Sequence, residues 1–207
     1  DADKEVERLL VEIKELPDEI TLEDKAKVKE LFDSYDKLSE EHKLKVTNAD
    51  KLINSYKTII KLEEAEAIKD MEAKIAKLPE LKDIVLDEEE KINNLYKEFT
   101  NLSEDVQNQV TNKDKLIEAK EKIDYVRGEV TSIEKDIWEK INPENITLEN
   151  KNIVYVLISR YNALDERDRK YVNHFDEVLD AKKVIDTLEK AEEKVDVKPE
   201  VKPETKP

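Results

Sequence analysis

The sequence predicts an all-α fold, in which three three-helix bundles form a tandem array joined by shared, spectrin-like helices into an elongated rod. Three features carry this prediction: a composition poor in turn residues, a recurring eight-residue phrase, and apolar residues spaced three and four apart. One Gly and six Pro among 207 residues supply little of the turn chemistry that strands need, whereas 43% charged residues with abundant Leu and Ile are typical of helices.

The recurring phrase divides the chain into three copies of one unit. It is KVTNADKL at 45–52, QVTNKDKL at 109–116 and, in a more divergent form, YVNHFDEV at 171–178. The flanking segments follow in register, so Leu22, Leu86 and Leu148 correspond, and the period is roughly 62–64 residues, as in arrays of supersecondary units. We expect copy one at 1–64, copy two at 65–127 and copy three at 128–194.

Within a copy, the apolar spacing predicts three helices. In copy one the apolar stripes are Val6, Leu9, Ile13 and Leu16 for the first helix, Leu22, Val28, Leu31, Tyr35 and Leu38 for the second, and Leu52, Tyr56 and Ile59 for the third. A bundle of about 60 residues is marginally stable alone, so contacts between copies are expected to matter.

The connectors carry helix-start signals. Thr21 with Asp24 has the spacing of a capping box, in which the Thr oxygen accepts a free N–H of the first turn. Thr47 with Asp50 repeats this spacing inside the recurring phrase, as do its counterparts in the other copies. The phrase is therefore predicted to mark the start of the third helix, and Ser39, Ser103 and Asp165 are expected to cap a short turn before it.

The first boundary between copies is predicted to lie inside one continuous helix. No Pro or Gly occurs from Ala49 to Leu78, so the last helix of copy one can run into the first helix of copy two. Residues 61–67 are expected to be helical throughout, because nothing in them stops a helix.

The second boundary contains Gly128. Apolar residues from Leu116 to Ile141 keep the helical spacing through it, which favours a shared helix. A Gly inside a helix costs about 1 kcal/mol relative to Ala, and Thr131 with Glu134 could start a new helix. Both a continuous and an interrupted helix are therefore open here, and continuity would make neighbouring copies stabilise one another.

The last residues, VDVKPEVKPETKP at 195–207, alternate Pro with charged residues. Such a segment has no side chains from which to build a core, so we expect a disordered linker rich in Pro, Lys and Glu.

A family resemblance follows from the complete repeat. The pattern I-x-x-L-P…I-T-L-x-x-K…L-S-x-x-x-x-x-V-T-N-x-x-x-L, closed by a K-P-E tail, resembles helical repeat modules of Gram-positive cell-surface proteins. Copy one carries it in full, in Ile13, Leu16, Pro17, Ile20, Thr21, Leu22, Leu38, Ser39, Val46, Thr47, Asn48 and Leu52. Copy two has Val85 in place of Thr21, and copy three has Asn142-Pro143 in place of Leu-Pro.

The resemblance implies a bacterial extracellular location, at the cell surface or secreted. It implies arrays that space or present other domains, in wall-anchored adhesins or large secreted enzymes. It brings no catalytic residue to this chain.

The charge of the chain limits its partners. A net charge of −16 argues against nucleic acid, because phosphate binding requires clustered Lys and Arg, and against anionic lipid surfaces. No apolar run approaches the roughly 20 residues of a transmembrane helix, so no membrane insertion is expected.

No motif predicts catalysis, a cofactor or a metal. Cys is absent, which excludes thiolate ligands, and the histidines, His42 and His174, have no second ligand at the spacing of a metal site. The acidic run 87–90 lies at a predicted helix start, where carboxylates match the helix dipole, and it lacks the Gly of a calcium loop. We expect a protein that is not an enzyme, although it could be an accessory region of a larger secreted enzyme.

Copy three departs from the other copies in its aromatic and apolar residues. Large apolar side chains replace mostly polar or small residues of copies one and two at Trp138, Tyr155, Val156, Tyr171 and Phe175. Either the core of copy three is thicker, or it contacts an adjacent domain of the parent protein, or these residues form a binding patch.

Two functions are consistent with these features. The first is a helical spacer or stalk that positions neighbouring domains. The alternative is an adhesin-type module that binds a host protein through the aromatic patch of copy three, since aromatic side chains are favoured anchors at interfaces. Solvent exposure of these residues distinguishes the two.

Overall fold

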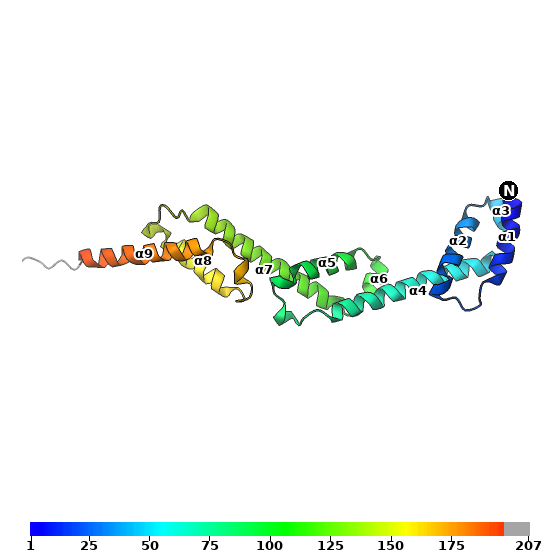
Figure 1. Cartoon of the computed structure of the whole chain (residues 1–207), viewed down its shortest axis with the longest axis horizontal. Helices are drawn as coiled ribbons and strands as arrows, with labels where there is room; N and C mark the ends of the chain where they lie inside the picture. The colour runs from blue at the N-terminus through cyan, green and yellow to red at the C-terminus, as the bar shows by residue number, and fades with distance from the viewer. Residues whose placement is uncertain (197–207) are drawn as a thin grey trace, which may run out of the picture. The chain divides into compact units, whose positions relative to one another are not determined.

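The computed structural model of the protein describes residues 1–196, whose regular structure is entirely helical, and this confirms the all-α prediction. The elements, which Figure 1 follows from blue to red, are α1 (Ala2–Glu15), η1 (Leu22–Asp24), α2 (Lys25–Asp36), α3 (Glu40–Lys45), α4 (Ala49–Ala76), η2 (Leu81–Asp83), η3 (Leu86–Glu88), α5 (Glu89–Thr100), α6 (Glu104–Gln109), α7 (Lys113–Lys140), η4 (Leu148–Asn150), α8 (Lys151–Ala163), η5 (Arg169–Tyr171) and α9 (Phe175–Asp196). The first residues of the predicted linker, Val195 and Asp196, belong to α9, and the rest of the linker lies outside the described residues.

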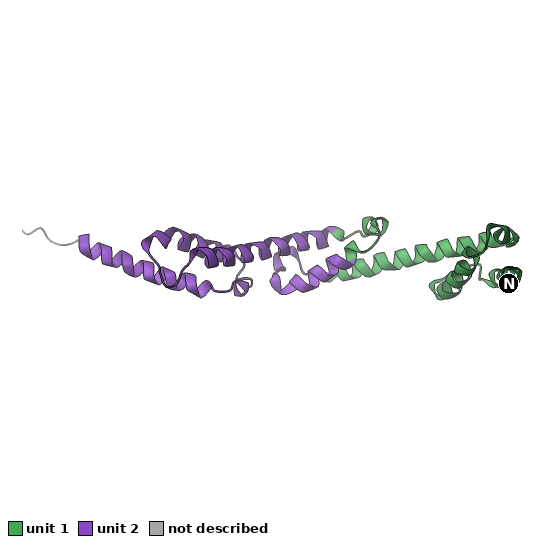
Figure 2. Cartoon of the chain, turned by 90° about the horizontal axis from the view of Figure 1, so that it is seen from above, with its two compact units in different colours: residues 1–77, 99–113 green, residues 78–98, 114–207 purple. Residues whose placement is uncertain are grey.

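Contacts divide the chain into two compact units (Figure 2). Unit 1 comprises residues 1–77 and 99–113, and unit 2 comprises residues 78–98 and the chain from 114 onward. Copy two, expected at 65–127, contributes to both units.

Unit 1 has an apolar core between α1, α2 and α4. Leu9, Leu31 and Ile59 are completely buried in it, and the rings of Phe32 and Tyr56 stack with centroids 3.9 Å apart. Within each helix, apolar residues spaced three and four apart along the sequence turn one face toward this core.

Unit 2 buries Ile133 of α7, Leu157 of α8 and Val178 of α9 completely. The rings of Tyr161 and Phe175 stack at 3.6 Å beside this core. Aromatic stacking therefore recurs in both units between the second and third helices of a copy.

The helices that cross the copy boundaries are unbroken. α4 and α7 each contain 28 residues, and α4 includes all of 61–67, as predicted. Gly128 lies in the interior of α7, so the interrupted helix that the sequence left open is not formed. Apart from its chain neighbours and the backbone of its own helix, a Cβ at Gly128 would meet no atom within 4 Å, so the glycine is not required by packing.

Capping boxes form where the second helices begin. The backbone N–H of Thr21 donates to Asp24 Oδ2 at 2.9 Å, as predicted, and that of Thr147 donates to Asn150 Oδ1 at the same distance. The hydroxyl of Ser39 accepts the N–H of His42 and caps α3, and Ser103 caps α6.

The recurring phrase marks the start of the third helix, as predicted, since α4, α7 and α9 all begin within it. The capping of α4 differs from the prediction. Asn48, not Thr47, is the N-cap of α4, and its side chain makes no capping hydrogen bond. Its Nδ2 instead donates to the carbonyl oxygen of Leu10 in α1 at 2.9 Å, and Asn112 donates in the same way to the carbonyl of Glu72. The capping-box prediction for Thr47 was wrong because the helix begins one residue later than predicted, at the N-cap Asn48. The Asn48 side chain does not cap its own helix and instead connects the start of α4 to α1.

Candidate functional site

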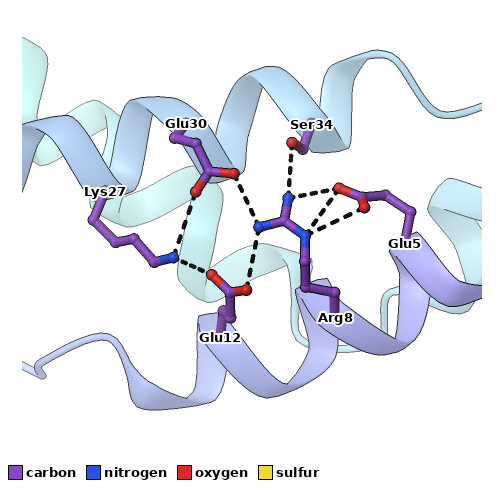
Figure 3. Close-up of polar contacts among 6 residues, drawn as sticks. All are labelled: Glu5, Arg8, Glu12, Lys27, Glu30 and Ser34. Atoms are coloured by element: carbon purple, nitrogen blue, oxygen red, sulfur yellow. Dashed lines mark hydrogen bonds and ion pairs between the residues drawn. The ribbon is translucent and has the colours of Figure 1, made fainter.

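The most extended polar cluster of unit 1 joins α1 to α2 (Figure 3). The Arg8 guanidinium donates to Glu5 at 2.6 Å, to Glu12 at 3.2 Å and to Ser34 Oγ at 3.0 Å. It also pairs with Glu30 at 2.9 Å. Lys27 contacts Glu12 and Glu30, so the cluster holds five charged side chains in one network.

Charge pairing sets the protonation of this cluster. The hydrogen bond from Lys27 and that from Arg8 hold the pKa of the Glu12 carboxyl below its usual value. The hydrogen bond to Glu5 raises the pKa of Arg8. The pKa of Glu5 is likewise lowered and that of Lys27 raised, so these shifts favour the charged forms, which are unsuited to the proton transfer that general acid–base catalysis needs.

Copy three builds the same brace with its residues exchanged. Arg160 of α8 occupies the position of Ser34, and Ser132 of α7 occupies that of Arg8. Arg160 donates to Ser132 Oγ at 2.7 Å and to Asp136 at 2.7 Å, and it lies 3.8 Å from Glu129. Because the guanidinium is retained while its supporting helix changes, the cluster is a structural brace between the first and second helices.

A second ion pair joins the second and third helices in every copy. It consists of Lys25 with Glu63 at 2.5 Å in copy one, Glu89 with Arg127 at 2.7 Å in copy two, and Lys151 with Glu189 in copy three. The polarity is reversed in copy two. The hydrogen bond to Glu89 raises the pKa of Arg127, whereas that from Lys25 lowers the pKa of Glu63.

Unit 2 contains a polar joint between copies two and three. Asp168 is 1% exposed, and its Oδ1 accepts the backbone N–H of Leu86, 82 residues earlier, at 2.6 Å. Next to it, Asp87 accepts hydrogen bonds from Lys170 and from the hydroxyl of Tyr171. The joint therefore connects the segment 165–172 of copy three to the short helical turn η3 of copy two.

Burial shifts the pKa of the Asp168 side chain. Desolvation raises the pKa of its carboxyl, although the Leu86 N–H acts in the opposite direction and the Asp165 carboxylate adds to the rise. The neighbouring Asp87 behaves oppositely, because hydrogen bonds from Lys170 and Tyr171 lower its pKa. Nothing in the sequence pointed to this joint, since Asp168 stands among charged residues and replaces Val106 and His42 of the other copies.

The predicted aromatic residues of copy three do not gather into one patch. Phe175 is buried at 9% exposure against Tyr161, so it belongs to the core of its own copy. Tyr171 lies in the joint, with the Arg127 guanidinium 5.5 Å from its ring centroid. For Phe175 this position favours the thicker core, whereas Tyr171 contacts copy two, which was not among the alternatives.

The remaining three predicted residues are exposed. Tyr155 and Val156 on α8 are 41% and 40% exposed, and Lys151 and Lys182 lie over the Tyr155 ring at 5.9 and 5.8 Å. Trp138 is 88% exposed. It lines a groove of about 430 Å³ that contains none of the other predicted residues.

The groove at Trp138 is formed where α7 ends and α9 begins. Its lining residues are Glu134, Ile137, Trp138, Ile141, Asn142, Pro143, His174 and Glu177. His174 has a positive φ of 63°, a conformation rare for residues other than glycine, and its ring is 3.3 Å from the Glu177 carboxylate.

Residues 1–196 contain no group of three or more His, Cys, Asp or Glu side chains placed to hold a metal ion. None of the helices in this described part is long and apolar enough to cross a membrane.

No protein-family model, curated protein or solved structure matches the chain.

Proposed function

We propose that the chain is a non-enzymatic helical spacer, a stalk of three repeats that positions neighbouring domains of a bacterial surface or secreted protein. The extracellular location rests on the resemblance of the repeat pattern to Gram-positive surface modules. In this proposal each copy is a three-helix bundle, and the copies form a rod through their shared helices.

The observation that carries the proposal is the continuity of α4 and α7 through the copy boundaries, at 64/65 and 127/128. A hinge between domains needs a loop or helix end that absorbs changes in backbone dihedrals. A continuous helix, with every backbone hydrogen bond in place, resists bending, so it suits a part that sets a distance.

The polar contacts support the same role. The Arg8 and Arg160 braces lock the first and second helices of their copies, and the Asp168–Leu86 hydrogen bond fixes copy three on copy two. The helices that these contacts join are thereby held in one register, which suits a spacer.

Distances between spin labels test the continuity of α4. Because the chain lacks Cys, cysteines introduced at the exposed positions Lys57 and Ala73 are the only labelling sites. We expect a narrow distance distribution, since 16 helical residues separate the backbone positions by about 24 Å at 1.5 Å per residue. A broad distribution in the otherwise unmodified chain contradicts the spacer.

The matched control is the same labelled chain with Glu66→Pro. Proline removes a helical hydrogen bond in the exposed middle of α4, so this variant should give a broad distribution. Small-angle scattering supplies an independent measurement: a radius of gyration near the ~17 Å of a compact globule of this length rejects the rod.

A second role, binding of a partner protein through copy three, is favoured by one observation. Trp138 is almost fully exposed beside an apolar groove, whereas a spacer alone has no need of a large exposed indole. Its counterparts in the other copies are Lys14 and Ala76, so the bundle folds without an aromatic residue there.

A further inference from the structure

We infer that the Trp138 groove binds the guanidinium group of an arginine side chain presented by a partner protein. The inference rests on the second role proposed above, and it supplies the chemistry of the partner. The spacer role does not depend on it.

The first argument is the composition of the groove. Ile137 and Ile141 form an apolar floor, being 1% and 5% exposed, and the indole of Trp138 rises from it into solvent. The carboxylates of Glu134 and Glu177 complete the lining. An apolar surface with an aromatic face and carboxylates matches a side chain that has an aliphatic stem and a cationic, planar end.

The second argument is the local field. Trp138 lies in the last turn of α7, where the helix dipole and the free carbonyl groups favour a cation. The opposing positive end of α9 is already matched by Asp176 and Glu177 in its first turn. Glu134 accepts a 3.3 Å bond from Asn173, and Glu177 contacts the His174 ring. Among the described residues neither forms a salt bridge with Lys or Arg, although the Glu134 carboxylate also attracts the Arg127 guanidinium electrostatically.

The third argument is a filled version of the same arrangement in unit 2. At the joint, the Arg127 guanidinium lies 5.5 Å from the Tyr171 centroid and is paired with Glu89 at 2.7 Å. An aromatic ring, a carboxylate and an arginine meet there. The Trp138 groove has the ring and the carboxylates without the arginine.

Other aromatic rings of copy three are occupied by the chain's own cations. Tyr155 lies under Lys151 and Lys182, and Tyr161 lies under Arg169 at 5.7 Å. Among the described residues, none presents a cation to the Trp138 ring. Indole is the strongest cation–π acceptor of the natural side chains, so the ring best suited to a cation is the one left open to a partner.

Fluorescence tests the inference directly, because Trp138 is the only Trp in the chain. The probe is acetyl-triarginine amide, and its uncharged isostere, acetyl-tricitrulline amide, is the comparison. At 0.15 M salt, where contacts between distant exposed charges are screened, we expect a saturable change in emission with triarginine. Binding of tricitrulline should be about tenfold weaker or more, as expected when a cation–π contact and an ion pair are lost.

Charge-matched variants separate the groove from general attraction to an acidic protein. Glu177→Gln should weaken triarginine binding several-fold, in line with loss of a charge-assisted contact. Glu193→Gln, which removes the same charge at an exposed site of α9, should leave it unchanged. A calorimetric titration of Trp138→Leu should show no binding, and circular dichroism should show that the variant is folded.

Several outcomes overturn the inference. They are equal binding of both peptides, equal weakening by Glu177→Gln and Glu193→Gln, and binding that survives in Trp138→Leu. An emission change with a neutral oligosaccharide and none with triarginine also overturns it, while leaving a binding role for the groove. The absence of any emission change with triarginine also overturns the inference, and the spin-label distances judge the spacer separately.

Discussion

The loops that precede the third helices of copies two and three occupy the same place in the repeat but use it differently. In copy two this loop forms α6, and its side chains bond to the backbone of their own copy. Gln107 Nε2 donates to the carbonyl oxygens of Leu102, at 2.7 Å, and of Thr100, and Gln109 Nε2 donates to the carbonyl oxygen of Asp105. In copy three it forms the turn η5, from which Asp168 and Tyr171 reach residues 86–87. The same segment of the repeat can therefore contact its own copy or a neighbouring one, depending on a few side chains.

Position 168 accounts for one of these contacts. Val106 is 4% exposed and Asp168 is 1% exposed, so both positions are buried, but only the Asp can accept a backbone N–H. Burying a carboxylate or an N–H without a hydrogen-bond partner costs free energy, so this one hydrogen bond offsets the burial of both the Asp168 carboxylate and the Leu86 N–H.

Giving copy three the residue of copy two should have the largest effect. Asp168→Val leaves the buried N–H of Leu86 without an acceptor, and such a group costs about 1–3 kcal/mol. We expect a lower free energy of unfolding by that amount in urea, with faster hydrogen exchange in 81–90. If exchange in this segment is unchanged, Asp168 does not hold the joint.

Reversing an ion pair should have a smaller effect. Arg127→Glu places a carboxylate against Glu89 and removes the cation over Tyr171, at a cost of about 1 kcal/mol, because Arg127 is 38% exposed. Adding Glu89→Lys restores the polarity of Lys25–Glu63 and should recover most of the loss. A double variant no more stable than the single would show that the pair itself contributes little.

The two shared helices differ at Gly128, since α4 contains no glycine. Gly128→Ala should raise the free energy of unfolding by about 0.5–1 kcal/mol, because the helix is continuous and the new methyl group meets open space. Thermal unfolding followed by circular dichroism measures this. A decrease in stability would place Gly128 in a non-helical conformation.

The smallest effect concerns pH. The pKa of Asp168 is raised by burial, so the folded protein holds this proton more tightly than the unfolded chain. Its contribution to stability is therefore greatest at acidic pH, and it falls as pH rises through the folded pKa. Asp168→Asn keeps an acceptor for the Leu86 N–H but cannot carry the charge. The free energy of unfolding of this variant, relative to that of the unmodified protein, should therefore increase from pH 4 to pH 7. The lower pH is close to 3.8, the ordinary pKa of an Asp carboxyl.

Denaturation curves at both pH values measure the difference. A constant difference would mean that Asp168 titrates normally. The sign is opposite for Asp87, whose lowered pKa makes its contribution disappear as pH falls through the folded value.

The sequence was sufficient for features that depend on neighbouring residues. The helices, the Thr21–Asp24 box and the Ser39 cap follow from local spacing, and the continuity of α4 follows from the absence of breakers. At Gly128 local preference allowed two outcomes, and packing of Val130 and Ile133 on the buried side of α7 decided for the helix.

Long-range contacts could not be predicted in this way. Asp168 stands in a polar segment and is buried only because that segment meets residues 82 positions away. The same limitation applies to Asn48, whose amide bonds Leu10 in another helix, and to the dispersal of Trp138, Tyr155 and Tyr171 over separate surfaces. Comparing the three copies identifies positions where one copy differs, but it does not show which of these residues are in contact in the folded chain.

The alternating polarity of the pair between the second and third helices bears on folding fidelity. Copies of similar sequence can exchange helices as the chain folds, which is a known failure of repeat proteins. If the second helix of copy one paired with the third helix of copy two, Lys25 would face Arg127, and the reciprocal exchange would set Glu89 against Glu63. Like charges thus oppose exchange between adjacent copies, whereas copies one and three share a polarity.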